Sequence, residues 1–271
     1  MRRSVRSLVV LPLLLGACGG GATGTQAPGA SPPAEPVGLT VLAAASLRNA
    51  LERVAAGYEA TQDAAILTIA TDSSAALEAQ IEQGAPADVF LSADVANPQK
   101  LVDAGLVAGP AVAFASNELA VIVPAGNPAG IETPADLARP GVRIIAATDA
   151  VPITRYAHQL TEHLALEPGY PAGFAVACAA NVVSREANVS AIVAKIELGE
   201  GDAAIVYATD AHASAKVSTV EVPAAANVRA TYAGVALRGS PNRAAASGFL
   251  AWLAGPDGQA ILGTFGFLPP S

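Results

Sequence analysis

The chain has 271 residues, of which 52% are hydrophobic and 14% are charged, a composition that builds a sizeable core and excludes global disorder. Its 15 Lys and Arg residues are outnumbered by 23 Asp and Glu, and aromatic residues make up only 4%. We therefore expect no nucleic-acid partner, because phosphates need clustered basic side chains and single strands need aromatic platforms. With two cysteines and three histidines, we also expect no protein-built metal centre and no cofactor.

The first residues predict an export signal. Three arginines precede a short apolar run at residues 8–15, which is shorter than the ~20 residues that a membrane span needs. The run leads into the sequence L-G-A-C, which ends at Cys18 and resembles the bacterial lipobox. We expect residues 1–17 to be a lipoprotein signal peptide and Cys18 to be lipidated. The alternative is an ordinary secretory signal in which Cys18 is incidental. Residues 18–38, rich in Gly, Ala, Pro, Ser and Thr, predict a flexible tether.

From residue 39 onwards, short strand-like runs alternate with helical patterns. Runs such as 119–124 and 203–207 are continuously apolar, which is typical of strands buried on both faces. The alternation predicts α/β layers with a largely parallel sheet. Two apolar stretches, near residues 116–119 and 218–223, are candidate crossings between two lobes. They divide the chain into a discontinuous first lobe, residues 39–117 and 219–271, and an inserted second lobe, residues 118–218.

Four predicted helices begin directly after strands, near Ser46, Ser74, Ile153 and Val189. The first N–H groups of a helix lack partners and lie at the positive end of its dipole, so they attract anions. In open α/β sheets, ligands bind at the carboxyl ends of the strands. Converging on one cleft, these four turns would make an uncharged oxyanion site lined by hydroxyl groups. The alternative is that the serines in these turns simply cap their helices.

Four segments are specific enough to indicate a family. They are L-T-V-L-A-A-A-S-L at residues 39–47, the long run at residues 72–93, G-x-A-x-x-x-Y-x-x-D-A at residues 201–211, and the closing segment 249–267. In this order they resemble the periplasmic molybdate-binding proteins of ABC transporters. The resemblance implies a two-lobed periplasmic-binding-protein fold of type II, with the ligand cleft between the lobes. It implies capture of molybdate, and of tungstate, for delivery to a membrane permease. We accordingly expect a monomeric, extracytoplasmic binding protein, lipid-anchored to the cell membrane, and not an enzyme.

The resemblance also assigns a site. In this family the oxyanion is held by two serine hydroxyls, by backbone N–H groups and by one tyrosine hydroxyl. The matching positions are Ser46, Ser74, Ile153, Val189 and Tyr207, with Ser73 and Thr154 as secondary candidates. Molybdenum would therefore be bound only as molybdate, a dianion that carries no protons at neutral pH and can only accept hydrogen bonds. A cleft made of donors alone disfavours protonated phosphate, whereas sulfate must be excluded by its size.

Two positions depart from the family pattern. Asp72 stands where relatives often carry Gly or Ala, and a carboxylate would repel a dianion unless it is turned away or capped by backbone donors. Ile153 stands where many relatives carry Ala, so its side chain must point away from the cleft. The neighbouring Thr154 either adds a hydroxyl or caps the helix. Arg155 is either a solvated helix charge or an aid to the anion.

Three alternative functions remain open from the sequence. The first is a receptor of the same fold for another oxyanion, such as sulfate or phosphate. The second is a serine-dependent hydrolase, although the chain has no G-x-S-x-G motif and its histidines show no triad context. The third is a surface lipoprotein outside transport, such as an adhesin or sensor.

Overall fold

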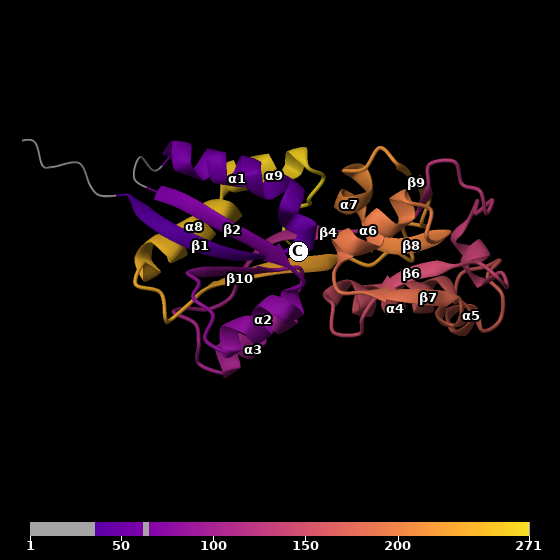
Figure 1. The fold of residues 1–271 in the computed structure, drawn as a ribbon, viewed down its shortest axis with the longest axis horizontal. Helices are drawn as coiled ribbons and strands as arrows, with labels where there is room; N and C mark the ends of the chain where they lie inside the picture. Colours follow the sequence, from indigo (N-terminus) through magenta and orange to yellow (C-terminus); the bar gives the residue numbers. More distant parts are fainter. Residues whose placement is uncertain (1–35, 62–64, 271) are drawn as a thin grey trace, which may run out of the picture. The chain divides into compact units, whose positions relative to one another are not determined.

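A computed structural model describes residues 36–61 and 65–270, and these residues belong to one compact unit (Figure 1). The expected signal peptide, Cys18 and almost all of the expected tether lie outside the described residues. None of the helices in the described ranges is long and apolar enough to cross a membrane. Two five-stranded sheets, each with its own helices, make up the described chain.

The first sheet has the strand order β2-β1-β3-β10-β4. Its strands are β1 (Val37–Ala44), β2 (Ala65–Asp72), β3 (Val89–Ser92), β4 (Val112–Asn117) and β10 (Ala230–Ala236). Its helices are the short 3-10 helix η1 (Ala45–Leu47), α1 (Arg48–Thr61), α2 (Ser74–Glu82), α3 (Ala96–Asp103), α8 (Arg243–Ala254) and α9 (Pro256–Thr264). In Figure 1, α1 and α9 lie on one side of this sheet, and α2 and α3 lie on the other. Both faces of the central strands are therefore buried, which explains the continuous apolar runs in the sequence.

The second sheet has the strand order β7-β6-β8-β5-β9. Its strands are β5 (Leu119–Pro124), β6 (Ile144–Ala147), β7 (Val182–Glu186), β8 (Ala203–Tyr207) and β9 (Val217–Val220). Its helices are the 3-10 helix η2 (Pro134–Ala138), α4 (Pro152–Leu164), α5 (Phe174–Ala180), α6 (Val189–Glu197) and α7 (Ala208–His212). The two sheets, each layered with helices, confirm the expected α/β class with two lobes.

The prediction of a largely parallel sheet is confirmed in both sheets, because four of the five strands run in the same direction and only one strand in each sheet is antiparallel. β1 runs parallel to β2 and β3, but β10 runs antiparallel to β3 and β4. In the second sheet β6 runs parallel to β7 and β8, but β5 runs antiparallel to β8 and β9. The cause is the chain path. β5 and β10 each follow a passage from the other sheet, and each enters its new sheet in the opposite direction to its neighbours.

The chain passes between the two sheets twice. β4 ends at Asn117 and β5 begins at Leu119, so a single residue separates strands of different sheets. The return passage lies between Val220, which still pairs with β5 beyond the expected lobe boundary, and the start of β10. The side chain of Asn227 fastens the two passages together. Its Oδ1 accepts a hydrogen bond from the N–H of Leu119, and its Nδ2 donates to the carbonyl of Leu119, both at 3.0 Å.

A group of buried aromatic side chains joins the two sheets. Tyr207 at the end of β8 packs edge-on against Tyr232 of β10, with 5.6 Å between ring centroids. Tyr156 of α4 lies 6.3 Å from Tyr207, and Phe267 lies 5.4 Å from Tyr232. Each fully buried ring contributes ~1.5–3 kcal/mol by leaving water. Tyr207 and Tyr232 thereby bring their hydroxyl groups into the buried junction between the two sheets.

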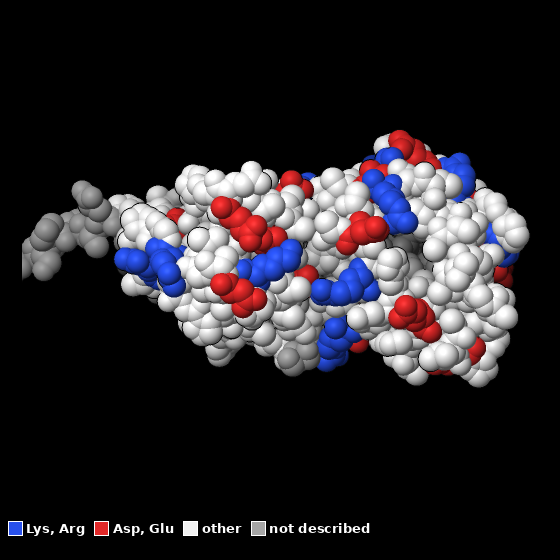
Figure 2. Space-filling model, turned by 90° about the horizontal axis from the view of Figure 1, so that it is seen from below, with Lys and Arg blue, Asp and Glu red and all other residues white. Residues whose placement is uncertain are grey.

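Charged side chains are spread thinly over the surface. Figure 2 shows basic and acidic residues interspersed on the face that it presents, with broad uncharged areas between them. Nucleic-acid backbones bind to continuous basic stripes. The described residues on this face form no such stripe.

Candidate anion-binding site

A small pocket lies where helices begin after the strands of both sheets. About 210 Å³ of space that atoms do not fill lies in and just outside it, part of this space being open to solvent. Its lining residues are Ala44, Ala45, Ser46, Ser73, Ser74, Ala93, Val151, Pro152, Val189 and Tyr207. No charged side chain is among them, so any ligand is held by hydroxyl and backbone groups. The first six residues come from the first sheet's turns and the last four from the second sheet's, so the pocket needs both.

Ser46 lies in the short helix η1, directly after β1, and is almost fully buried. Its Oγ accepts a hydrogen bond of 2.9 Å from the hydroxyl of Tyr232. A serine oxygen that already accepts from the protein keeps its own hydrogen available for a ligand. Ser46 is therefore prepared as a donor.

Ser73 and Ser74 stand at the start of α2 and are both buried. Ser73 is the N-cap, because its Oγ accepts from the N–H of Ala76 at 3.2 Å. Ser74 is the first helical residue, and its Oγ accepts from the N–H of Ala93 at 3.0 Å. The capping interpretation thus holds for Ser73. Both residues line the pocket, and because each oxygen accepts from the protein, each hydroxyl keeps its hydrogen to donate.

The pocket's second half begins at α6. Asn188 is the N-cap of this helix, and its side chain accepts from the N–H of Ala191 at 3.1 Å. Val189 is the first helical residue and lines the pocket. The first N–H groups of a helix have no intrahelical acceptor, and the helix dipole makes this end positive. Ser190 does not line the pocket. Its hydroxyl donates to the carbonyl of Ala45, at 3.5 Å.

Tyr207 closes the pocket from the end of β8, and only 2% of its surface is exposed. Among the described residues, its hydroxyl has no hydrogen-bond partner. A buried polar group left unpaired costs ~1–3 kcal/mol, so such groups mark places where a partner is missing. Burial raises the pKa of the Tyr207 hydroxyl well above its ordinary value. The group therefore stays protonated and can only serve an anion as a donor.

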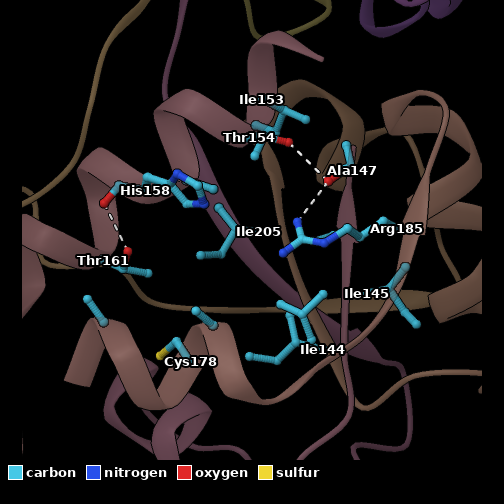
Figure 3. A pocket seen from close by; sticks show the side chains of 15 residues that line it. Ile144, Ile145, Ala147, Ile153, Thr154, His158, Thr161, Cys178, Arg185 and Ile205 are labelled. Carbon is cyan, nitrogen blue, oxygen red and sulfur yellow. Dashed lines mark hydrogen bonds between the residues drawn. The ribbon is translucent and has the colours of Figure 1, made fainter. Parts of the chain in front are cut away.

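Ile153 and Thr154 sit at the start of α4, beside the pocket rather than on its wall. Pro152 lines the pocket and lacks an N–H, so the N–H of Ile153 is the first that α4 offers. The side chain of Ile153 lines a separate, mostly apolar cavity together with Cys178 (Figure 3). Its bulk is therefore kept out of the anion-binding pocket. The hydroxyl of Thr154 donates to the carbonyls of Ala147 and Thr148, at 3.2 and 2.9 Å. Thr154 thus secures the helix start.

Asp72 is capped by donors and does not line the pocket. Its Oδ1 accepts from the N–H of Ser73 at 2.7 Å and from the side-chain amide of Asn188 at 3.1 Å. Because Asp72 ends a strand of the first sheet and Asn188 caps a helix of the second, this bond ties the two together. The carboxylate that departs from the family pattern therefore serves as a contact between the lobes.

A second polar contact joins the lobes at Asp94, the residue that follows Ala93 in the chain. The guanidinium of Arg155 on α4 lies 3.3 Å from Oδ2 of the buried Asp94. Asp94 also accepts from the hydroxyl of Ser92 and from the N–H and side-chain amide of Asn97. Arg155 is thus neither a freely solvated charge nor a wall of the pocket. Sequence reasoning missed Asp94, Asn188 and Tyr232 as supporting residues, because their partners are distant in sequence.

The described residues offer little for metal or acyl-transfer chemistry. No three His, Cys, Asp or Glu side chains in the described ranges gather into a group that could hold a metal ion. The hydrogen-bond partners of Ser46 and Ser74 are a tyrosine hydroxyl and a backbone N–H, and a nucleophilic serine needs a general base there. The arrangement provides donors for binding.

Comparison with known proteins places this geometry in context. A family model described as bacterial extracellular solute-binding protein matches residues 39–268. The chain is 34% identical to the molybdate-binding protein ModA of Mycobacterium tuberculosis over 253 residues, which cover 92% of each chain.

Solved structures give the same picture. The periplasmic molybdate-binding protein of Azotobacter vinelandii is similar with a TM-score of 0.71 and 25% identity, covering 86% of this chain and all of that one. The sulfate-binding protein SubI of Mycobacterium tuberculosis is similar with a TM-score of 0.77 and 21% identity, covering 86% of both chains. At that identity the likeness shows the fold alone.

Proposed function

We propose that this chain, which belongs to the bacterial extracellular solute-binding protein family, captures molybdate in the pocket described above and delivers it to an ABC permease. Members of this family bind solutes outside the cytoplasm and are not enzymes. The observation that carries the proposal is the uncharged, donor-rich lining of the pocket, which includes Tyr207 with its buried hydroxyl unpaired among the described residues. Molybdate needs such a lining, because it is an unprotonated tetrahedral dianion.

The ligand-binding groups are the hydroxyls of Ser46, Ser74 and Tyr207 and the N–H groups of Ile153 and Val189. Hydrogen bonds to a charged group contribute ~1.5–3 kcal/mol each, and a dry pocket strengthens them further. A few such bonds support micromolar or tighter binding after the entropic costs of association. Tungstate has the same charge and nearly the same size, so we propose that it binds as well. Sulfate makes shorter bonds to its oxygens and fits the donor set less well.

Binding and lobe closure are coupled in this proposal. The donors come from both sheets, so the ion bridges the lobes and shifts the population towards the closed arrangement. Two polar contacts accompany closure, Asp72 with Asn188 and Arg155 with Asp94. The closed protein then docks on the membrane permease.

Further proposals concern the setting of the protein. The lipobox-like sequence supports a lipid anchor at Cys18 that holds the protein at the membrane surface. We also propose that it acts as a monomer, with each copy carrying a complete pocket.

A thermal-unfolding series with the Cys18→Ser protein tests the function. Ligand at 1,000 times its Kd adds ~4 kcal/mol of stability, which raises the unfolding midpoint by several degrees. We expect molybdate and tungstate to raise the midpoint, and sulfate and phosphate to leave it unchanged at the same concentration. Ser46→Ala should abolish most of the shift. Ser247→Ala, which removes an exposed hydroxyl on α8, should retain it.

Other outcomes would contradict the proposal in different ways. A shift with sulfate or phosphate alone would overturn the specificity and keep an anion receptor. An unchanged midpoint with all four ions would remove oxyanion capture altogether. A shift that Ser46→Ala leaves intact would place the anion elsewhere in the molecule.

A further inference from the structure

Three buried side chains form a hydrogen-bonded series that ends at the pocket. The side-chain amide of Asn117 donates to the hydroxyl oxygen of Tyr232 at 3.4 Å, and that hydroxyl meets Oγ of Ser46 at 2.9 Å. The same amide also donates to the hydroxyl of Thr209, at 2.8 Å. All of these residues are at most 5% exposed. Water is therefore largely kept from the series, and the protein itself decides where each hydrogen points.

The amide at one end sets the direction of the series. An amide nitrogen has hydrogens and no lone pair to offer, so it can only donate. The Tyr232 oxygen receives that donation, and its own hydrogen is left for Ser46. The Ser46 oxygen in turn accepts, and its hydrogen is turned towards the pocket. A Tyr232 hydrogen turned back towards the amide would face the amide hydrogens, so the bond to Ser46 is the one that this hydrogen can make.

We propose that Tyr232 is a positioning residue that presents Ser46 to the ligand as a donor and thereby helps to select an unprotonated dianion. The inference deepens the proposed function and rests on it. Tyr232 does not line the pocket, so it acts through Ser46 and not by touching the ligand.

The other two serines of the pocket show why this residue matters. Oγ of Ser73 and Oγ of Ser74 accept from backbone N–H groups, which no side-chain substitution removes. The Ser46 oxygen alone among the three depends on a side chain. When that oxygen is left without its donor, it can accept a hydrogen from a protonated oxyanion. Hydrogen phosphate carries one such P–OH group at neutral pH, and molybdate carries none.

The test is the Tyr232→Phe variant, measured by isothermal titration with sodium molybdate and with sodium phosphate at pH 7. We expect the Kd for molybdate to rise about 5- to 10-fold, the effect of one neutral hydrogen bond. The Kd for phosphate should stay the same or fall. The ratio of the two Kd values is the decisive readout, because general loosening of the pocket would weaken both ions alike. Tyr58→Phe removes the phenol hydroxyl of another buried tyrosine, one that does not line the pocket, and should leave the ratio unchanged.

A double-mutant cycle separates action through Ser46 from a merely structural role. In the Ser46→Ala background, Tyr232→Phe should have no further effect on the Kd for molybdate. Equal losses in both backgrounds, or an unchanged ratio of the two Kd values, would overturn the inference. If the unaltered protein binds no oxyanion, the proposed function and this inference fail together. If it binds molybdate normally and Tyr232→Phe changes nothing, this inference alone fails.

Discussion

From the unpaired hydroxyl of Tyr207 we predict that its removal has opposite effects on the stability of the ligand-free protein and on the affinity for the anion. In the structure this hydroxyl is buried and has no partner among the described residues, and Tyr207 lines the pocket. Tyr207→Phe removes the hydroxyl and keeps the ring that packs against Tyr156 and Tyr232. The ligand-free protein should therefore become more stable, while the protein with bound anion should lose a hydrogen bond.

The two magnitudes follow from the burial. An unsatisfied buried hydroxyl costs ~1–3 kcal/mol, so we expect the ligand-free variant to gain about 1 kcal/mol. For a chain of this size, that gain raises the unfolding midpoint by roughly 2–4 °C. A hydrogen bond to a charged ligand contributes ~1.5–3 kcal/mol, so the Kd for molybdate should rise about 10- to 150-fold.

Two measurements on the same variant check both signs. Thermal unfolding without ligand gives the change in stability, and isothermal titration with molybdate gives the change in Kd. The Tyr58→Phe variant serves as the control and should show neither effect. A lower midpoint for ligand-free Tyr207→Phe would mean that the hydroxyl has a partner in the empty protein. An unchanged Kd would mean that the hydroxyl does not reach the anion, and the site would need revision.

Three further predictions concern ionisable groups. Burial raises the pKa of Asp210 from 3.8 to about 8, so the folded state keeps a proton that the unfolded state loses. The free energy of unfolding should then fall as pH rises from 5 to 8, by up to about 1.4 kcal/mol per unit, and urea titrations of Asp210→Asn should show a shallower fall. Parallel slopes would contradict this. Arg155 is half exposed, so its bond to Asp94 contributes ~1 kcal/mol or less. Arg155→Gln should raise the Kd for molybdate by about 5-fold or less, and this increase should be smaller at high salt. An increase of the same size at low and at high salt would count against the contact. Burial raises the pKa of the Cys178 thiol to about 12, so Ellman's reagent should label it at pH 8 only after unfolding, and rapid labelling of the native protein would refute its burial.

Local chemistry made the serines of the pocket's lining predictable from the sequence, whereas Tyr207 was predicted only from the family resemblance. Each lining serine follows a strand and opens a helix, and that pattern is visible within a few residues. The same local pattern favoured every one of these serines as a helix cap, which is confirmed for Ser73 by its bond to Ala76 and is wrong for Ser46 and Ser74. The family resemblance also predicted that the large side chain of Ile153 must point away from the pocket. It could not say that an apolar cavity would receive it.

The supporting contacts could not be predicted, because each joins residues far apart in the chain. Tyr232 and Ser46 are 186 positions apart, and Asn188 and Asp72 are 116 positions apart. Tyr232 lies in an apolar strand, where the sequence indicates a structural ring and nothing of its hydroxyl. The direction in which β10 runs could likewise not be predicted from the sequence. It depends on the chain's return from the second sheet, and strand periodicity carries no information about direction.

The division of the pocket between two sheets has a consequence for how the ion leaves. Ser46 and Ser74 belong to one half, and Val189 and Tyr207 to the other. Separating the two halves would break all of the ion's hydrogen bonds to one half at the same time. Water would enter, and the remaining bonds would weaken because the surroundings become more polar. If the proposed function holds, a transporter that separates the two halves would release the ion without a proton or a competing ligand. The donors that capture the ion would then also permit its release by mechanical separation.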